Sequence, residues 1–260
     1  MKEYGYCRLS LVPVRAEARE SSEMVTQLLF GDLYHVLEYN TNKDWLYVEG
    51  QADGYRGWIG NKLHHNVTEA FFQEAQQRQP IASLEICGKL HLPGQQLHVV
   101  LGSSLPIEEQ SLFGSNDRLK FEGKTHIIRK IKNAEVLKDF AFQYIESPYL
   151  WGGKSPFGID CSGLMQMVYK LGGYQLQRDA SQQALAGEEV ASLGDVLEGD
   201  LAFFHNPQGR ITHVGMMLSG SKIIHASGRV RIDRLDEKGI FNEQEKKYTH
   251  SLSHLRRIVT

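Results

Sequence analysis

Cys161 lies where a nucleophile could be placed, in the segment FGIDCSGLMQMVYKLGG of residues 157–173. Apolar residues at Leu164, Val168 and Leu171 follow the spacing of one helix face, so the cysteine falls on the first turn of a predicted helix. Unpaired backbone N–H groups and the positive end of the helix dipole favour a thiolate there, which should lower the pKa of the thiol and supply donors for an oxyanion. The alternative interpretation is a small buried thiol beside a helix cap.

A cysteine nucleophile needs a base, and two histidines are candidates. In the segment GDLAFFHNPQGRITHVGMMLSGSKIIHASG, His213 and His225 fall on two predicted antiparallel strands, residues 211–218 and 222–226. A loop of odd length between these strands would place the two side chains opposite each other on one face, and a two-residue turn would place them on opposite faces. On one face, one histidine would take the thiol proton while the other orients its ring. The alternative interpretation is a pair of half-buried strand histidines.

The composition narrows the class of protein. The 260 residues contain 41% hydrophobic and 23% charged residues with a formal net charge of −2, which is typical of a soluble globular protein and indicates no nucleic-acid and no membrane partner. Three cysteines, Cys7, Cys87 and Cys161, form neither a disulfide framework nor a zinc motif, so we expect free thiols and no metal or cofactor. If Met1 is the natural start, the absence of a signal-peptide pattern after it predicts a cytoplasmic protein.

The chain changes in character twice along its length. Residues 1–65 contain short apolar strands broken by Gly, Asp and Asn, which predicts a small β-barrel. Residues 66–80 are typical of a helical or irregular connector, and β patterning over residues 81–132 predicts a second barrel. From about Asn133 the pattern is mixed, beginning with the predicted helix AEVLKDFAFQYIE. The predicted domains are residues 1–65, residues 66–132 and residues 133–260.

Residues 144–228 resemble the catalytic core of NlpC-type papain-like cysteine peptidases, which cleave bacterial cell-wall peptides. The matching pieces are YLWGG at residues 149–153, GIDCSGL around Cys161, GDLAFF at residues 199–204, THVGM around His213 and IIHAS around His225. The combination is specific, because His213 follows the cysteine by 52 residues and His225 follows 12 residues later. The resemblance implies that Cys161 is the nucleophile, His213 the base and His225 the third polar residue.

Residues 1–65 resemble the bacterial SH3-like domain that is often attached to this family, on the segments RAEARESSEMVTQLLFGD and DGYRGW. The order of the domains is similar to that of the YkfC-like branch, in which two such barrels precede the catalytic domain. The implied architecture is therefore multidomain, with two small all-β SH3-like barrels followed by an α+β papain-like cysteine peptidase domain. The prediction of the second barrel rests mainly on this order of domains.

Members of that branch cut the bond between γ-linked D-glutamate and an L-diamino acid in murein peptides that have a free N-terminal L-alanine. The resemblance implies that the ammonium group of this alanine meets Asp179, in LQRDASQQ, together with Tyr55 and Glu17 of the first barrel. Tyr149 and Trp151 would form walls of the site. An ammonium group in a closed cleft must be paired with an acid, which agrees with such a specificity.

Most of these substrate-binding candidates have a structural alternative. Asp160 can cap the predicted helix or contact substrate, and Ser162 can donate to a substrate carbonyl or satisfy the helix start. Asp179 can be a turn acid, and Tyr55 and Trp151 can be packing residues.

The sequence thus predicts a cytoplasmic cysteine endopeptidase that hydrolyses γ-D-glutamyl-L-diamino acid bonds in recycled murein peptides. Its predicted partner is the peptide substrate, and no metal or cofactor is implied. The alternatives are an amidase or acyltransferase on the same fold, and a wall-binding protein without activity.

Overall fold

The computed structural model describes residues 2–92, 94–105 and 119–259 of the chain. The chain forms two compact units, Met1–Ile128 and Arg129–Thr260. Each unit is described by itself below. Within the described ranges, no helix combines the length and the apolar character needed to cross a bilayer.

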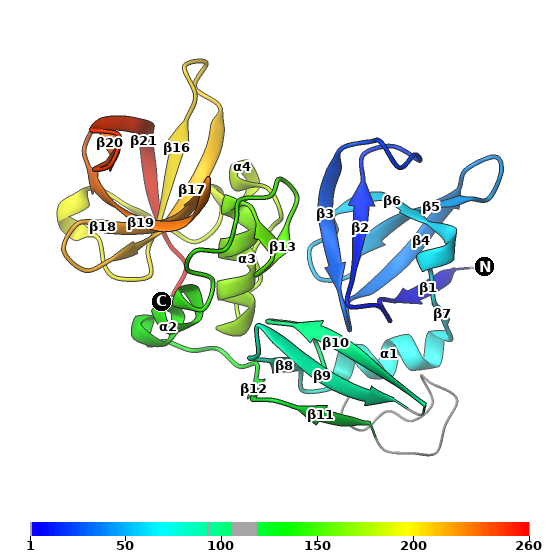
Figure 1. Ribbon diagram of the computed structural model, residues 1–260. Helices are drawn as coiled ribbons and strands as arrows, with labels where there is room; N and C mark the ends of the chain where they lie inside the picture. Colours follow the sequence, from blue (N-terminus) through cyan, green and yellow to red (C-terminus); the bar gives the residue numbers. More distant parts are fainter. Residues whose placement is uncertain (1, 93, 106–118, 260) are drawn as a thin grey trace. The chain divides into compact units, whose positions relative to one another are not determined.

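A seven-stranded antiparallel sheet forms the first part of the N-terminal unit, in the order β3-β2-β6-β5-β4-β1-β7 (Figure 1). Its strands are β1 Glu3–Tyr6, β2 Leu11–Arg15, β3 Met24–Leu29, β4 Leu33–Tyr39, β5 Trp45–Gly50, β6 Arg56–Gly60 and β7 Asn66–Val67, with a short 3-10 helix at Asn61–Leu63. The turn between β3 and β4 contains Gly31. Gly31 has φ of +90°, and a side chain there would lie 2.1 Å from the carbonyl oxygen of Ser104, so the turn requires glycine.

The remainder of this unit does not confirm a second SH3-like barrel. The predicted connector is helical, as α1 Glu69–Gln77, and described strands form a three-stranded sheet β10-β9-β11 and a two-stranded sheet β12-β8. These strands are β8 Ile81–Ser83, β9 Cys87–Leu92, β10 Gln95–Val100, β11 Lys120–Glu122 and β12 Thr125–Ile127. The predicted turn GSNDR, residues 114–118, lies outside the described residues.

The core of this region explains why a second barrel is not confirmed. Its buried side chains, such as Leu90 and Val99, pack in one cluster with Tyr4, Tyr6 and Phe30 from the first sheet. These strands therefore complete a core with strands of the first sheet and do not enclose a core of their own. The division at residue 65 stays a prediction, and the contacts group residues 66–128 with the first sheet.

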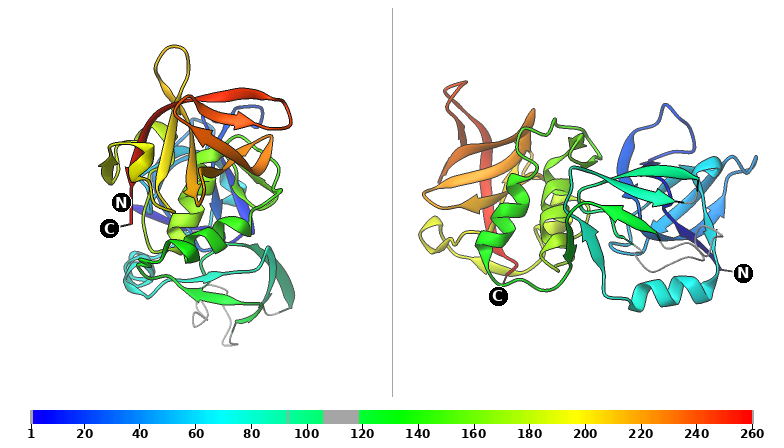
Figure 2. Two further views of the ribbon diagram at one scale, coloured as in Figure 1. Left: turned by 90° about the vertical axis from the view of Figure 1, so that its left-hand side faces the viewer. Right: turned by 60° about the horizontal axis from the view of Figure 1, so that its bottom comes forward.

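The C-terminal unit is a mixed α+β fold. Its sheet has the order β15-β21-β16-β17-β18-β19-β20, and β21 also pairs with β20, so the strands close on themselves (Figures 1 and 2). The helices are α2 Ala134–Phe142, α3 Cys161–Leu171, α4 Ala180–Gln183 and the 3-10 helix Leu193–Asp195. The strands are β13 Lys154–Ser155, β14 Gly158–Ile159, β15 Glu188–Val190, β16 Leu201–His205, β17 Ile211–Leu218, β18 Lys222–Ser227, β19 Arg229–Asp236, β20 Gly239–Asn242 and β21 Lys247–Arg257.

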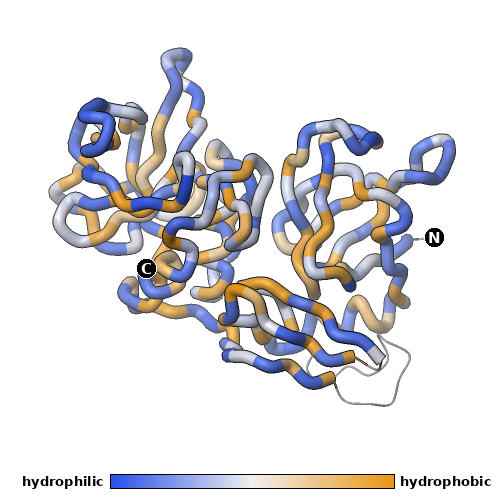
Figure 3. Tube along the Cα trace, in the orientation of Figure 1, coloured by the Kyte–Doolittle hydropathy of each residue, from blue (hydrophilic) through white to orange (hydrophobic). Residues whose placement is uncertain are grey.

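Helix α3 is the central element of this unit. It packs against α2, β17 and β18, and side chains on all of its faces, including Leu164, Met167 and Tyr169, are fully buried. Figure 3 shows apolar stretches separated by polar ones along the trace, and the central strands β16 and β17 are buried over most of their length. The predicted strand 211–218 is confirmed as β17, and β18 extends one residue beyond the predicted 222–226.

Candidate active site

Helix α3 begins at Cys161, and Asp160 is its N-cap. Oδ1 of Asp160 accepts a hydrogen bond of 2.7 Å from the backbone N–H of Gly163, and Oδ2 accepts one of 2.8 Å from the N–H of Gly152. The capping alternative for Asp160 is therefore the one that the structure shows. The cap fixes the first turn of the helix, and with it the position of Cys161.

A buried arginine that the sequence did not indicate holds the same carboxylate. Arg178 donates to Oδ1 and Oδ2 of Asp160 over 3.0 and 2.6 Å, and to Oγ of Ser162 over 2.9 Å. Ser162 in turn donates to Oδ1 of Asp160 over 3.3 Å. The polar atoms of Asp160 and Ser162 thus already have protein partners, which favours their structural roles over substrate contact. The substrate roles of both residues stay predictions.

The thiol of Cys161 is buried, with 6% of the residue exposed. Burial and the nearby charge of Asp160 raise its pKa to about 12, while the backbone of Val214 and of Ser162 and the charge of Arg178 lower it in part. The expectation of a lowered pKa at the helix N-terminus is therefore wrong, because desolvation outweighs the helix dipole here. The contact with Val214 places the sulfur beside the residue that follows His213 on β17.

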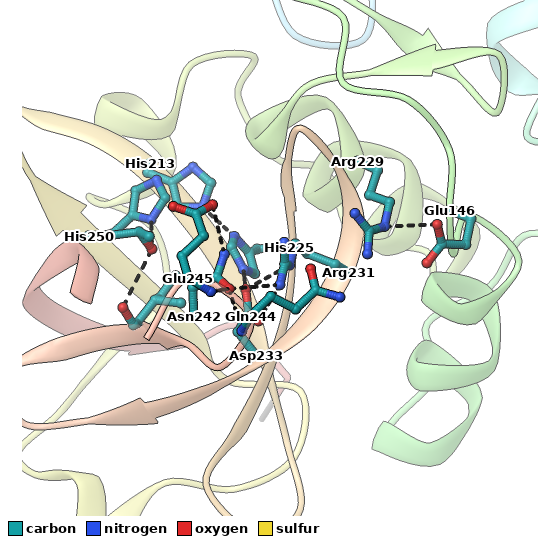
Figure 4. A network of polar contacts seen from close by, with 12 residues as sticks. Glu146, His213, His225, Arg229, Arg231, Asp233, Asn242, Gln244, Glu245 and His250 are labelled. Atoms are coloured by element: carbon teal, nitrogen blue, oxygen red, sulfur yellow. Dashed lines mark hydrogen bonds and ion pairs between the residues drawn. The ribbon is translucent and has the colours of Figure 1, made fainter. Parts of the chain in front are cut away.

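His213 and His225 meet on one face of the sheet. Nε2 of His213 and Nδ1 of His225 lie 2.9 Å apart, and the two rings are nearly perpendicular, at 88° (Figure 4). The shared face is confirmed, but direct opposition is wrong, because the register pairs His225 with Gly215 and leaves His213 at the diagonal position. The loop between the strands has the odd length expected, since residues 219–221 separate β17 from β18.

Burial makes this pair of histidines neutral. Desolvation, followed by the neighbouring His250 and His225, lowers the pKa of His213 well below its usual range. Desolvation also lowers the pKa of His225, although its hydrogen bond to Asp233 acts in the opposite direction. A neutral imidazole can accept a proton, so the pair has the form required of a general base and its partner.

Behind His225 the polar contacts continue to β19. Nε2 of His225 lies 3.1 Å from Oδ2 of Asp233, and Nη2 of Arg231 donates to Oδ1 of the same carboxylate over 2.9 Å (Figure 4). Only 7% of Asp233 is exposed. Burial raises its pKa, but the hydrogen bonds from His225 and Arg231 outweigh burial, so that the pKa lies below its usual value.

Comparison with known proteins relates the region that contains these residues to a protein family. Residues 146–249, which include the cysteine, both histidines and Asp233, match the NlpC/P60 family. The chain carries an NlpC/P60 peptidase domain. Residues 14–62 match the bacterial dipeptidyl-peptidase SH3 domain, so the first barrel is of the expected kind. With its cysteine and histidines, the chain is a cysteine peptidase.

Two relatives and one solved structure are similar to this chain. A γ-D-glutamyl-L-lysine dipeptidyl-peptidase of Bacillus subtilis is 45% identical over 94 residues, which is 35% of this chain and 31% of that relative. Dipeptidyl-peptidase 6 of Lysinibacillus sphaericus is 29% identical over 254 residues, which covers 86% of this chain and 88% of the relative. The crystal structure of an NlpC/P60 family protein from Bacillus cereus has a TM-score of 0.79 and 19% identity, covering 99% of this chain and all of that one, which shows the shared fold.

A third histidine of the NlpC/P60 domain lies against the pair. The ring of His250, from β21, stacks on that of His213 with centroids 4.0 Å apart and an interplanar angle of 23°. Nitrogen atoms of His213, His225 and His250 come within 4.8 Å of one another, the spacing of a metal site. A metal ion lies in the plane of each imidazole that binds it, and two nearly parallel stacked rings do not share such a point. The ring geometry therefore favours packing over a three-histidine metal site.

The predicted walls of the site differ in exposure. Burial, with smaller contributions from the charges of Cys161 and Asp160, raises the pKa of Tyr149. Trp151 is 59% exposed on the loop before β13. Asp179 is half-buried and is the N-cap of α4, where its backbone N–H donates to Oε1 of Gln182 over 3.4 Å. The substrate roles of Tyr149, Trp151 and Asp179 stay predictions.

Two predicted residues belong to the N-terminal unit. Tyr55 is half-buried, and its backbone N–H donates to Oδ1 of Asp53 over 3.0 Å. Glu17 is exposed and pairs with Arg19 over 2.9 Å. Both residues lie on exposed connections of the barrel, and their roles toward substrate stay predictions.

The sequence did not indicate Asp233, Arg231 or His250, because the strands that carry them were not predicted. A signal for the first two existed. Gly228, with φ of +70°, turns β18 into β19, and counting outward from it pairs His225 with Arg231 and leaves Asp233 at the next position on the same face. His250 could not have been found in this way, because its contact with His213 joins strands that are distant in sequence.

Proposed function

We propose that the chain is an endopeptidase that hydrolyses the bond between γ-D-glutamate and an L-diamino acid in murein peptides with a free N-terminal L-alanine. The observation that carries this proposal is the hydrogen-bonded pair of His213 and His225, on β17 and β18, together with the contact between the thiol of Cys161 and the backbone of Val214, the residue after His213. The names of the two relatives above, which refer to dipeptidyl-peptidases, support the choice of substrate. We further propose that the enzyme acts in the cytoplasm on recycled wall peptides.

The proposed reaction has two steps, and His213 moves a proton in each. In the first, Nδ1 of His213 takes the thiol proton of Cys161 while the sulfur attacks the γ-carbonyl carbon of D-glutamate. The backbone N–H of Cys161, unpaired at the helix start, donates to the oxyanion. Collapse of the intermediate expels the amine of the diamino acid, which receives the proton from His213. In the second step, His213 deprotonates a water molecule that hydrolyses the thioester.

The proposed specificity depends on pairing the ammonium group of L-alanine. Asp179 is the proposed partner in the C-terminal unit, and Tyr55 and Glu17 are the proposed partners in the N-terminal unit. Tyr149 and Trp151 are proposed to form walls of the site around Cys161. An ammonium group that leaves water needs such an acid, because an unpaired charge is costly to bury.

One assay tests the proposal. The full chain is incubated with L-Ala-γ-D-Glu-L-Lys-D-Ala, and the products are identified by mass spectrometry. We expect L-Ala-γ-D-Glu and L-Lys-D-Ala from the unaltered enzyme, no turnover by Cys161→Ala, and near-normal turnover by Cys87→Ala, because Cys87 is exposed and lies in the N-terminal unit. Cleavage of the peptide by a folded Cys161→Ala variant would end the assignment of the nucleophile.

The same assay separates the alternatives. Release of ammonia from an amidated peptide would indicate an amidase, and a product joined to an added amine would indicate an acyltransferase. Binding to insoluble murein without turnover of any soluble peptide would indicate a wall-binding protein.

A further inference from the structure

The contacts behind His213 end on a charged group that the proposed reaction has not used. A chain of three short contacts runs from His213 to His225, from His225 to Asp233 and from Asp233 to Arg231, over 2.9, 3.1 and 2.9 Å (Figure 4). His225 is fully buried, and Asp233 and His213 are 7% and 5% exposed. Water therefore has little access to these groups, and each proton must be placed by its neighbours.

The position of each proton follows from the chemistry of the acceptors. An ionised carboxylate only accepts hydrogen bonds, so the proton of the contact between Asp233 and His225 lies on Nε2 of His225. A neutral imidazole carries one N–H, so Nδ1 of His225 is an acceptor. The proton of its contact with His213 must then lie on Nε2 of His213. This leaves Nδ1 of His213 without a proton, as a base requires.

Arg231 allows an ionised Asp233 to lie beside a neutral His225. A carboxylate alone beside His225 would favour its imidazolium form, in which both nitrogens donate. Nδ1–H of His225 would then donate to Nε2 of His213, and the proton of His213 would lie on its own Nδ1. Arg231 opposes this, because its charge lowers the pKa of His225 while its hydrogen bond keeps Asp233 ionised.

We propose that Asp233, balanced in charge by Arg231, is a positioning residue that fixes the proton of His213 on Nε2 and so keeps Nδ1 free to accept the thiol proton of Cys161. This inference rests on the proposed function of Cys161 and His213 as nucleophile and base. Asp233 exchanges no proton in the reaction. When His213 becomes an imidazolium, Nδ1 of His225 accepts from its Nε2–H, and Asp233 stabilises the polarised His225.

The decisive variant is Asp233→Asn, whose orientation Arg231 would select. Nη2 of Arg231 donates to Oδ1 of Asp233, whereas its Nε lies 2.9 Å from Oδ2 without forming a hydrogen bond. The amide oxygen would therefore face Nη2 of Arg231, and the amide N–H₂ would face Nε2 of His225. The proton of His225 would move to Nδ1, and that of His213 to Nδ1 as well. We expect kcat to fall by about 10²- to 10⁴-fold with little change in KM, as when the carboxylate of a serine-protease triad is amidated.

Two further variants accompany Asp233→Asn, one that removes the charge of Arg231 and one that serves as a control. Arg231→Gln should keep the tautomers at pH 8 but move the acid limb of the pH–rate profile upward by about one pH unit or more, because His225 is then protonated more readily. Asp236→Asn is the matched control, since Asp236 lies on the same strand but accepts from Tyr248 over 2.6 Å, and its kcat should be unchanged.

Nitrogen-15 NMR of histidine-labelled enzyme without substrate reads the tautomers directly. We expect Nε2–H forms of His213 and His225 in the unaltered protein and Nδ1–H forms in Asp233→Asn. An Nδ1–H form of His213 in the unaltered protein would overturn the inference. So would an Asp233→Asn variant that loses stability and activity in parallel, with unchanged tautomers and an unchanged pH profile.

The NMR measurement also separates this inference from the proposed function. If the unaltered enzyme leaves murein peptides intact, the proposed substrate is wrong, and the tautomers together with the rate of alkylation of Cys161 decide the role of Asp233. If the peptides are cleaved but the tautomers differ from those expected, the proposed function stands and the inference does not.

Discussion

At the scale of single residues, burial favours the neutral forms of Cys161 and His213, the proposed nucleophile and base. Burial raises the pKa of Cys161 to about 12 and lowers that of His213. Both shifts oppose a charged pair near pH 7 in the free enzyme. The thiol proton must move to His213 as the sulfur attacks, so the rate depends on where His213 holds its own proton.

Alkylation of Cys161 tests this resting state. In a Cys87→Ser background, which removes the exposed thiol, the rate of reaction with iodoacetamide should rise continuously between pH 6 and pH 9, because a thiol with a raised pKa gains thiolate throughout this range. Mass spectrometry of the modified peptide gives the rate at each pH. A rate that is constant from pH 5 to pH 8 would instead indicate a preformed thiolate–imidazolium pair.

At the scale of elements, the start of α3 depends on a buried ion pair. Arg178 and Asp160 have side chains only 2% and 7% exposed, and their closest contact is 2.6 Å. The pair joins the segment before α4 to the N-cap of α3. The position of the nucleophile therefore depends on a residue 17 positions after Cys161 in the sequence.

Breaking this ion pair should lower the free energy of unfolding. Arg178→Met leaves the charge of Asp160 buried without its cation, which should lower the free energy of unfolding by about 3–5 kcal/mol. The control is Lys247→Ala, which breaks a pair of similar length, 2.7 Å, whose side chains are 63% and 51% exposed. The control should lose at most about 1 kcal/mol. Urea unfolding of both variants gives the comparison, and equal losses would mean that burial of the Arg178 pair is not what matters.

At the scale of the whole molecule, buried neutral histidines make stability depend on pH. The pKa values of His64, His65, His213, His225 and His250 are all lowered, that of His250 to about 4. In the unfolded chain these groups bind protons near pH 6.5, so the unfolded state binds more protons than the folded state below that pH. Stability should therefore be highest above pH 6.5 and should fall as the pH falls toward 4.

Calorimetry between pH 7 and pH 5 measures this loss. Each histidine that is protonated only when unfolded contributes a slope of up to about 1.4 kcal/mol per pH unit. His250→Phe keeps a ring against His213 but removes one such group, so its slope should be smaller by up to that amount. The same melting temperature at pH 7 and pH 5 in the unaltered protein would contradict the prediction.

The proposed contribution of the N-terminal unit is also testable in the full chain. Glu17→Gln, Tyr55→Phe and Asp179→Asn should each lower kcat/KM on a free murein tripeptide by roughly 10- to 100-fold, the value of a charge-assisted hydrogen bond. Each should have little effect on the N-acetylated tripeptide, because acetylation has already removed the ammonium group. Activity on the free peptide should fall above about pH 8, where an α-amino group loses its proton.

The control for the barrel residues is Glu20→Gln. Glu20 lies in the same segment as Glu17 and forms an exposed pair with Arg15 over 3.3 Å. Its activity should be unchanged. Equal cleavage of the free and the acetylated peptide by the unaltered enzyme would remove the proposed roles of Glu17, Tyr55 and Asp179 together.

Much of the local structure is determined by the sequence itself. The 3.6-residue spacing after Cys161 and the aspartate before it specify a capped helix, and both are present as α3 with Asp160 at its N-cap. Strand alternation and the turn residues likewise specify β16, β17 and the shared face of His213 and His225. These features depend on neighbours in sequence, whose periodicity is visible in the chain.

The tertiary structure decided what depends on residues that are distant in sequence or on burial. A second SH3-like barrel is not confirmed, because the described later strands share a core with Tyr4, Tyr6 and Phe30. The pKa of Cys161 is raised, not lowered, because packing removes water that a helix start in isolation would have. Arg178 joins Asp160, and Asp233 and His250 join the two histidines, only because the folded sheet and helices bring their elements together.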